Sequence, residues 1–150
     1  MVDSYRRIVV PVASNPDSMR AVEVACRLAA EHRASLNVVT VVEVPALLPL
    51  DADMIEEEAA AHALLREADA IAEFHGVRAS TLLLRARTAG VAIVERAVAL
   101  DADLVVVGAV RHRVLGSRTP IFGRTVKHVL EHAPCRVFVI APSRDLAATA

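Results

Sequence analysis

Residues 104–142, LVVVGAVRHRVLGSRTPIFGRTVKHVLEHAPCRVFVIAP, decide the fold. The segment opens with a β-branched run at Leu104–Val107 and closes with another at Val137–Ala141, each typical of a strand buried on both faces. Between them lie a basic loop with glycines and a stretch with apolar residues at helical spacing, which begins at Gly123 or Thr125. A strand, a helix and a second strand in this order predict a right-handed crossover between parallel strands.

The same alternation runs through the preceding residues. β-branched and apolar runs predict strands at 8–12, 36–42 and 77–84, and helical spacing predicts helices from Pro16, over 51–75 and over 88–100. The last of these helices is expected to turn four residues toward the core: Val91, Val94, Ala97 and Val98. The complete order predicts an α/β fold, a doubly wound, flavodoxin- or Rossmann-like sheet of five parallel strands with helices on both faces. Ligands of such sheets bind beyond the carboxyl ends of the strands, where the strand order reverses.

Length and composition favour one domain over 1–142, followed by a tail at 143–150 that we expect to fray. The chain is 55% hydrophobic and its net charge is -1, which argues for a packed core and against a nucleic-acid partner. No apolar run approaches the ~18 residues of a membrane span, so we expect no membrane insertion. Cys26 and Cys135 make no disulfide framework, which favours a cytoplasmic location with reduced thiols.

The basic loop is the candidate site for an anion. Residues 111–128 contain no acid and carry five cationic side chains: Arg111, Arg113, Arg118, Arg124 and Lys127. The N–H groups at the start of the following helix have no partner within the helix and attract negative charge. Gly123 lets a ligand approach the backbone, and guanidinium groups bind phosphate oxygens in pairs. The alternative is a solvated basic loop whose glycines only make turns.

Other chemistry finds little support. The glycine spacing does not match a Walker A loop, and no G-x-G-x-x-G fingerprint is present. His128 and His132 are four residues apart on the last helix and precede Cys135, but no further ligand stands at metal-binding spacing, so no metal site is predicted. Because no nucleophile elbow is visible either, the chain is not expected to be an enzyme and no catalytic residues are named.

In combination, four segments make the chain resemble the universal stress protein family. They are Ile8–Val12 before a capped helix, Ala102–Gly108 (ADLVVVG), Gly123 leading into Val126 and Val129, and Ala133–Ile140 (APCRVFVI). The part from Ile121 onward also resembles stress-protein domains appended to some amino-acid transporters. The resemblance implies the strand order 3-2-1-4-5 and a homodimer that pairs through strand five, Val137–Ala141. An uncovered apolar edge strand is an aggregation hazard, which independently favours a covering partner.

The resemblance also implies an ATP site with the pattern G-x2-G-x9-G-[S/T] after strand four and an aspartate after strand one. Positions carried over are Pro11 and Val12 at the strand end, Val42 as a base contact, and the glycines Gly108 and Gly123. The sequence departs from the pattern at Ala13 in place of the aspartate, at Arg111 in place of the second glycine, and at Arg124, with Thr125 one position late. These departures indicate a remodelled anion site with a degenerate ATP motif.

Two functions are consistent with these features. The first is a regulatory protein that senses an adenine nucleotide, with the phosphates on Gly108, Arg111, Gly123, Arg124 and Thr125. The second is a ligand-free homodimeric interaction module, such as a regulator of a transporter, that acts through its dimer edge and the apolar loop 43–50. The leucines of that loop are expected to pack within the chain rather than to meet a partner.

Overall fold

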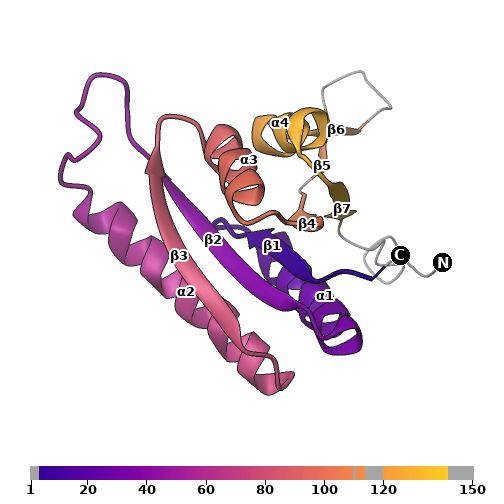
Figure 1. The fold of residues 1–150 in the computed structure, drawn as a ribbon. Helices are drawn as coiled ribbons and strands as arrows, with labels where there is room; N and C mark the ends of the chain where they lie inside the picture. Colours follow the sequence, from indigo (N-terminus) through magenta and orange to yellow (C-terminus); the bar gives the residue numbers. More distant parts are fainter. Residues whose placement is uncertain (1–3, 110, 114–119, 142–150) are drawn as a thin grey trace, which may run out of the picture.

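A five-stranded parallel sheet forms the centre of the computed structural model, which describes residues 4–109, 111–113 and 120–141 (Figure 1). Its strands are β1 (Arg7–Pro11), β2 (Ser35–Glu43), β3 (Ala79–Ala86), β4 (Leu104–Gly108) and β7 (Arg136–Ile140). They lie in the order β3-β2-β1-β4-β7, and every neighbouring pair is parallel. This order confirms the predicted 3-2-1-4-5 topology. The order reverses at β1, so the carboxyl ends of β1 and β4 form the switch point.

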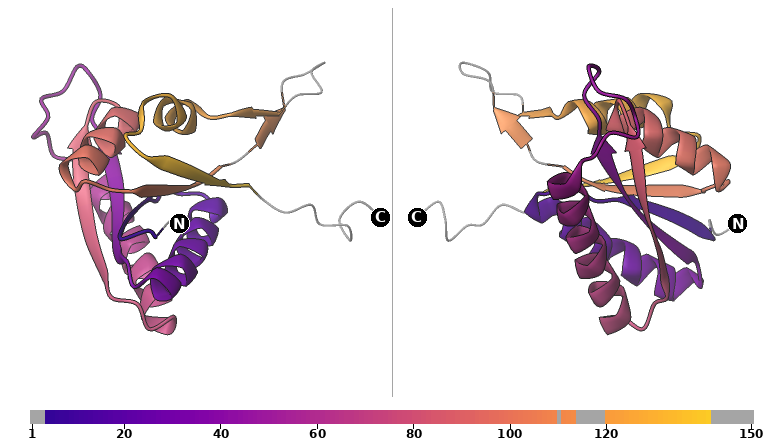
Figure 2. Two further views of the ribbon diagram at one scale, coloured as in Figure 1. Left: turned by 45° about the vertical axis from the view of Figure 1, so that its right-hand side comes forward. Right: turned by 90° about the vertical axis from the view of Figure 1, so that its left-hand side faces the viewer.

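Helices cover both faces of the sheet. α1 (Pro16–His32) and α2 (Ile55–Phe74) pack on one face, and α3 (Ala89–Ala99) and α4 (Arg124–His132) pack on the other (Figures 1 and 2). Side chains of β1 alternate between the two layers: Ile8 and Val10 join the α1 side, whereas Val9 joins the α3 side. This alternation explains why the central strands are apolar on both faces.

A small hairpin lies in the segment that we expected to be a loop. β5 (Arg111–Arg113) pairs antiparallel with β6 (Pro120–Phe122), with Arg111 opposite Phe122. The expectation of a loop was therefore incomplete. Each strand has only three residues, too few for a periodic pattern, and Pro120 at a strand start discourages a prediction of pairing.

The predicted inner face of α3 was wrong in part. Val91 and Val98 are 40% and 59% exposed, and Ile93, which was not expected there, is buried, whereas Ala97 is buried and Val94 packs on the core as predicted. The helix is apolar nearly all round, so spacing alone allows two registers that differ by one residue. Packing selects the register with Gly90 inward, because a Cβ there would lie 2.8 Å from the Cβ of His128 on α4. The two helices approach closely because this position has no side chain.

The leucines of the loop after β2 do not pack within the chain as expected. Leu47 is 99% exposed and Leu48 is 41% exposed. Arg85, near the end of β3, and Arg87, just after β3, hold the backbone of this loop instead. The Arg87 guanidinium donates to the carbonyl oxygens of Pro45 at 2.5 Å and Leu48 at 2.6 Å, and Arg85 Nε donates to the Leu50 carbonyl at 2.9 Å. The loop is fixed through its main chain, which leaves its side chains at the surface.

Candidate functional site

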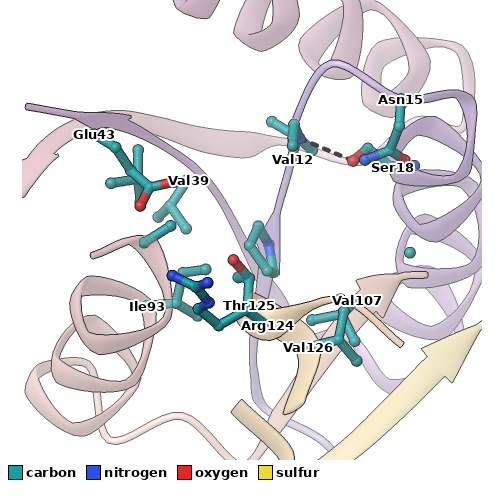
Figure 3. A pocket seen from close by; sticks show the side chains of 16 residues that line it. Val12, Asn15, Ser18, Val39, Glu43, Ile93, Val107, Arg124, Thr125 and Val126 are labelled. Carbon is teal, nitrogen blue, oxygen red and sulfur yellow. Dashed lines mark hydrogen bonds between the residues drawn. The ribbon is translucent and has the colours of Figure 1, made fainter. Parts of the chain in front are cut away.

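A cavity of about 270 Å³ lies at the switch point, beyond the carboxyl ends of β2, β1 and β4 and between α3 and α4 (Figure 3). Its floor and walls are mostly apolar, and polar groups gather at the starts of α1 and α4. The lining residues used below are Pro11, Val12, Ala13, Val39, Val41, Glu43, Ile93, Val107, Gly108, Gly123, Arg124, Thr125 and Val126.

Hydrogen bonds fix the β1 side of the cavity. Asn15 caps α1, because its side-chain oxygen accepts from the Ser18 backbone N–H at 2.9 Å. The Ser18 hydroxyl accepts from the Ala13 N–H at 2.8 Å, and the Thr40 hydroxyl donates to the Val12 carbonyl at 2.9 Å. The turn from β1 into α1 therefore has a defined position without help from a ligand.

The two glycines carried over from the sequence have different structural roles. Gly108 ends β4 against the first turn of α1, where a Cβ would lie 2.1 Å from the Asp17 carbonyl oxygen. That glycine is required by packing. Gly123 is the N-cap of α4, and a Cβ there would have no neighbour within 4 Å among the residues that the structure describes. Open space beside the first N–H groups of α4 makes Gly123 the position where a ligand can reach the backbone.

Charged groups flank the apolar floor. Arg124 and Thr125 lie in the first turn of α4, and Glu43 lies at the end of β2 (Figure 3). Within the part of the chain that the structure describes, neither the Arg124 side chain nor the Glu43 side chain makes a hydrogen bond or an ion pair. Both side chains are therefore available to a ligand. Phosphate suits the α4 end, where Arg124 adds its charge to the helix dipole.

The structure brings most of the predicted site residues together. Seven of the nine line the cavity: Pro11, Val12, Ala13, Gly108, Gly123, Arg124 and Thr125. Val42 does not, because it points to the opposite face of β2 and packs with Val44, Met54 and Ala61. Arg111 lies in β5, and its side chain falls outside what the structure describes.

Val41 occupies the place that we expected for Val42. Pro11 of β1 faces the cavity and pairs with Val39 of β2, so every second residue from Val39 faces the cavity too. This alternation selects Val41 and Glu43 and could have been applied from the sequence once the strand register was assumed. Ile93 was also missed, because the inner face of α3 was assigned one residue out of register.

The other candidate groups are not arranged as a metal or thiol site. The rings of His128 and His132 lie 4.4 Å apart, yet among residues 4–109, 111–113 and 120–141 no three His, Cys, Asp or Glu side chains gather as metal ligands do. Burial raises the pKa of the Cys26 thiol to about 11, and burial followed by the Asp103 charge raises the pKa of Cys135. Raised thiol pKa values oppose nucleophilic reactivity.

Comparison with known proteins identifies the family. The sequence model of the universal stress protein family matches residues 4–141. The chain belongs to this family. A universal stress protein of Methanocaldococcus jannaschii is 28% identical over 144 residues, covering 91% of this chain and 82% of the relative.

Solved structures of universal stress proteins share the fold. One from Archaeoglobus fulgidus superposes with a TM-score of 0.73 at 24% identity, covering 91% of this chain and 94% of the other. A universal stress protein in complex with cAMP superposes with a TM-score of 0.69 at 25% identity, covering 94% of this chain and all of the other (100%).

In the described part of the present chain, no helix combines the length and apolar character of a membrane span.

Proposed function

We propose that this universal stress protein is a non-enzymatic regulatory protein that senses an adenine nucleotide, or a related phosphate-bearing ligand, in the cavity at the switch point. The observation that carries the proposal is an apolar cavity that ends at the start of α4, where the N-cap Gly123, which has no side chain, is followed by Arg124 and Thr125. The cAMP complex of a structural relative at 25% identity supports the same ligand class.

The chemistry of the cavity suits a ligand with one anionic and one flat apolar part. Backbone N–H groups of α4, the Arg124 guanidinium and the Thr125 hydroxyl can all donate to phosphate oxygens. The aliphatic side chains of Val39, Val41 and Ile93 form a surface against which a base can lie. The volume of about 270 Å³ is at the small end for organic ligands, which favours a mononucleotide over a bulkier ligand.

Binding by titration calorimetry and thermal shift tests this proposal. AMP, cAMP, ADP and ATP are added to the full chain, and at least one should raise the melting temperature and give saturable binding. Arg124→Ala should weaken that binding roughly 10-fold or more, because a charged hydrogen-bond partner is lost. Arg27→Ala removes an equally exposed charge on α1 away from the cavity and should change nothing. If no nucleotide binds the wild-type protein, the proposal fails.

A homodimer through β7 belongs to the same proposal. β7 ends the sheet, and its apolar residues Val137–Ile140 are only partly covered. Pairing of two copies along this edge would satisfy the backbone groups that face outward.

A cytoplasmic location is proposed as well, and two free thiols, Cys26 and Cys135, support it.

A ligand-free interaction module remains the second candidate function, and one observation favours it. Leu47 and Leu48 are exposed on a loop whose backbone is held by arginine, so the loop presents leucine side chains at a defined place. The nucleotide titrations separate this candidate from the first, because an interaction module needs no nucleotide.

A further inference from the structure

We propose that Glu43 determines which base the cavity accepts. Its carboxylate would accept a hydrogen bond from an exocyclic amino group and so select an amino-bearing base, such as adenine, over a keto-bearing base, such as hypoxanthine. The inference rests on the proposed function and adds to it a residue that reads the base.

Strand geometry turns Glu43 toward the cavity. It is the last residue of β2 and lies on the same side of the strand as Val39 and Val41, which form part of the floor. Figure 3 shows Glu43 at one side of the cavity, Val107 at the other, and Ile93 and Arg124 between them. A ligand that lies across the floor from the β4 side therefore ends beside the Glu43 carboxylate.

The length of that path fits a nucleotide. β1 lies between β2 and β4, so level positions on β2 and β4 are two strand spacings apart, about 9.6 Å, and Glu43 lies four residues, about 13 Å along β2, beyond Val39, which pairs with Pro11 at the end of β1. Gly108 and Gly123 line the same cavity as Glu43, and Val39 and Val41 precede Glu43 along its β2 side. With the phosphate at Gly123, the sugar crosses β1 and the base lies over Val39 and Val41. The edge of the base then faces Glu43.

The Glu43 carboxylate is available to accept a hydrogen bond from a ligand. It makes no hydrogen bond or ion pair among the described residues, and it is the one acid among the described residues that line the cavity. An ionised carboxylate only accepts hydrogen bonds. An amino group at position 6 of a purine donates to it, whereas a keto oxygen there meets it acceptor to acceptor, and the N1–H donor that accompanies the keto group stands one ring atom away. Such unpaired polar groups are what make hydrogen-bond selection strong.

Other polar and charged groups near Glu43 suggest an alternative to base selection. Arg124, Thr88 and His128 share a neighbouring hollow with Glu43, and Glu57 of α2 shares another. Arg124 could therefore be drawn toward Glu43 when no phosphate is bound. In that case Glu43 would lower the affinity for every phosphate-bearing ligand alike, without reading the base.

AMP and IMP separate selection from a general charge effect, because position 6 of the purine is amino in AMP and keto in IMP, and N1 accepts in the first and donates in the second. Dissociation constants are measured by calorimetry on the full chain. We expect the wild-type protein to bind AMP at least roughly 10-fold more tightly than IMP. Glu43→Gln, whose amide both donates and accepts, should bring the two within roughly 3-fold. Glu95→Gln, an exposed acid on α3 outside the cavity, should keep the wild-type ratio.

The outcomes distinguish this inference from the proposed function. Equal binding of AMP and IMP by the wild-type protein overturns the role of Glu43 and leaves nucleotide binding intact. An equal gain in affinity for both ligands in Glu43→Gln also overturns it, because the carboxylate would then act only through charge. If neither ligand nor any other nucleotide binds, the proposed function fails and the inference fails with it. A wild-type preference for AMP that Glu43→Gln removes supports both.

Discussion

At the scale of single residues, Gly108 and Gly123 offer a matched pair of substitutions. Gly108→Ala places a methyl group against the backbone of Asp17 and Ser18, which can yield only if the start of α1 moves. We expect it to lower the free energy of unfolding by about 1–3 kcal/mol in urea titrations. Gly123→Ala meets no neighbour among the described residues and has a φ of -65°, so its effect should stay within about 0.5 kcal/mol. Equal losses in the two variants would contradict this assignment.

Cys26 gives a second residue-scale prediction, on pH. Its pKa is about 11 in the folded protein against 9.0 for the free thiol, so the folded state holds its proton more tightly. This contribution to stability is complete below pH 9 and is lost as the pH rises through about 11. The free energy of unfolding should therefore fall as the pH rises over this window. That of the Cys26→Ala variant should fall less steeply. Parallel curves for the two proteins would show that Cys26 has no part in it.

The sequence predicted which segments form the site but not which way every side chain of those segments points. The segments that end at the cavity were predicted from β-branched runs and capping signals, and most of the named residues do line it. Val42 was mistaken for Val41 because a run that is apolar on both faces does not tell which residues face which layer. Glu43 escaped notice for the same reason. Only the register against β1 supplies that information.

At the scale of elements, Arg87 should control the loop after β2. Arg87→Ala removes the hydrogen bonds to the Pro45 and Leu48 carbonyls, so the loop should open more often. We expect thermolysin, which cuts before leucine, to cleave it roughly 10-fold faster, as the loss of charge-assisted hydrogen bonds implies. Mass spectrometry locates the cut. Arg78→Ala, at an exposed site before β3, is the control, and equal cleavage of the two variants would contradict the role of Arg87.

Helix faces show why elements are easier to predict than their packing. α1 has one clear apolar stripe at helical spacing, and Ala21, Ala25 and Ala29 of that stripe are buried. α3 is apolar nearly all round, and its orientation depends on the contact of Gly90 with His128, a residue far along the chain. The hairpin of β5 and β6 likewise depends on pairing between two segments that are each too short to be recognised.

At the scale of the whole molecule, the β7 edge leads to a prediction about assembly. Light scattering over a concentration series should give a mass of twice 16.0 kDa for the wild-type chain. Ile140 accepts from the Ala109 N–H of the neighbouring chain segment, so the backbone of Val139, one residue earlier, faces outward. Val139→Pro removes an outward donor and should give a monomer, whereas Val139→Thr keeps the N–H and should stay dimeric. A wild-type monomer at every concentration would refute pairing through β7.

The position of β1 between β2 and β4 also has a consequence for biosynthesis. The Asp103 carboxylate accepts hydrogen bonds from the N–H groups of Arg6 and of Arg7, the latter 96 residues away in sequence. At usual rates of translation the ribosome needs roughly 5–20 s to add that length of chain. Throughout this interval one side of the central strand has no partner, and neither α4 nor the β4 wall of the cavity has been made. In a nascent chain the cavity is therefore complete only after the segment around Gly123 has emerged.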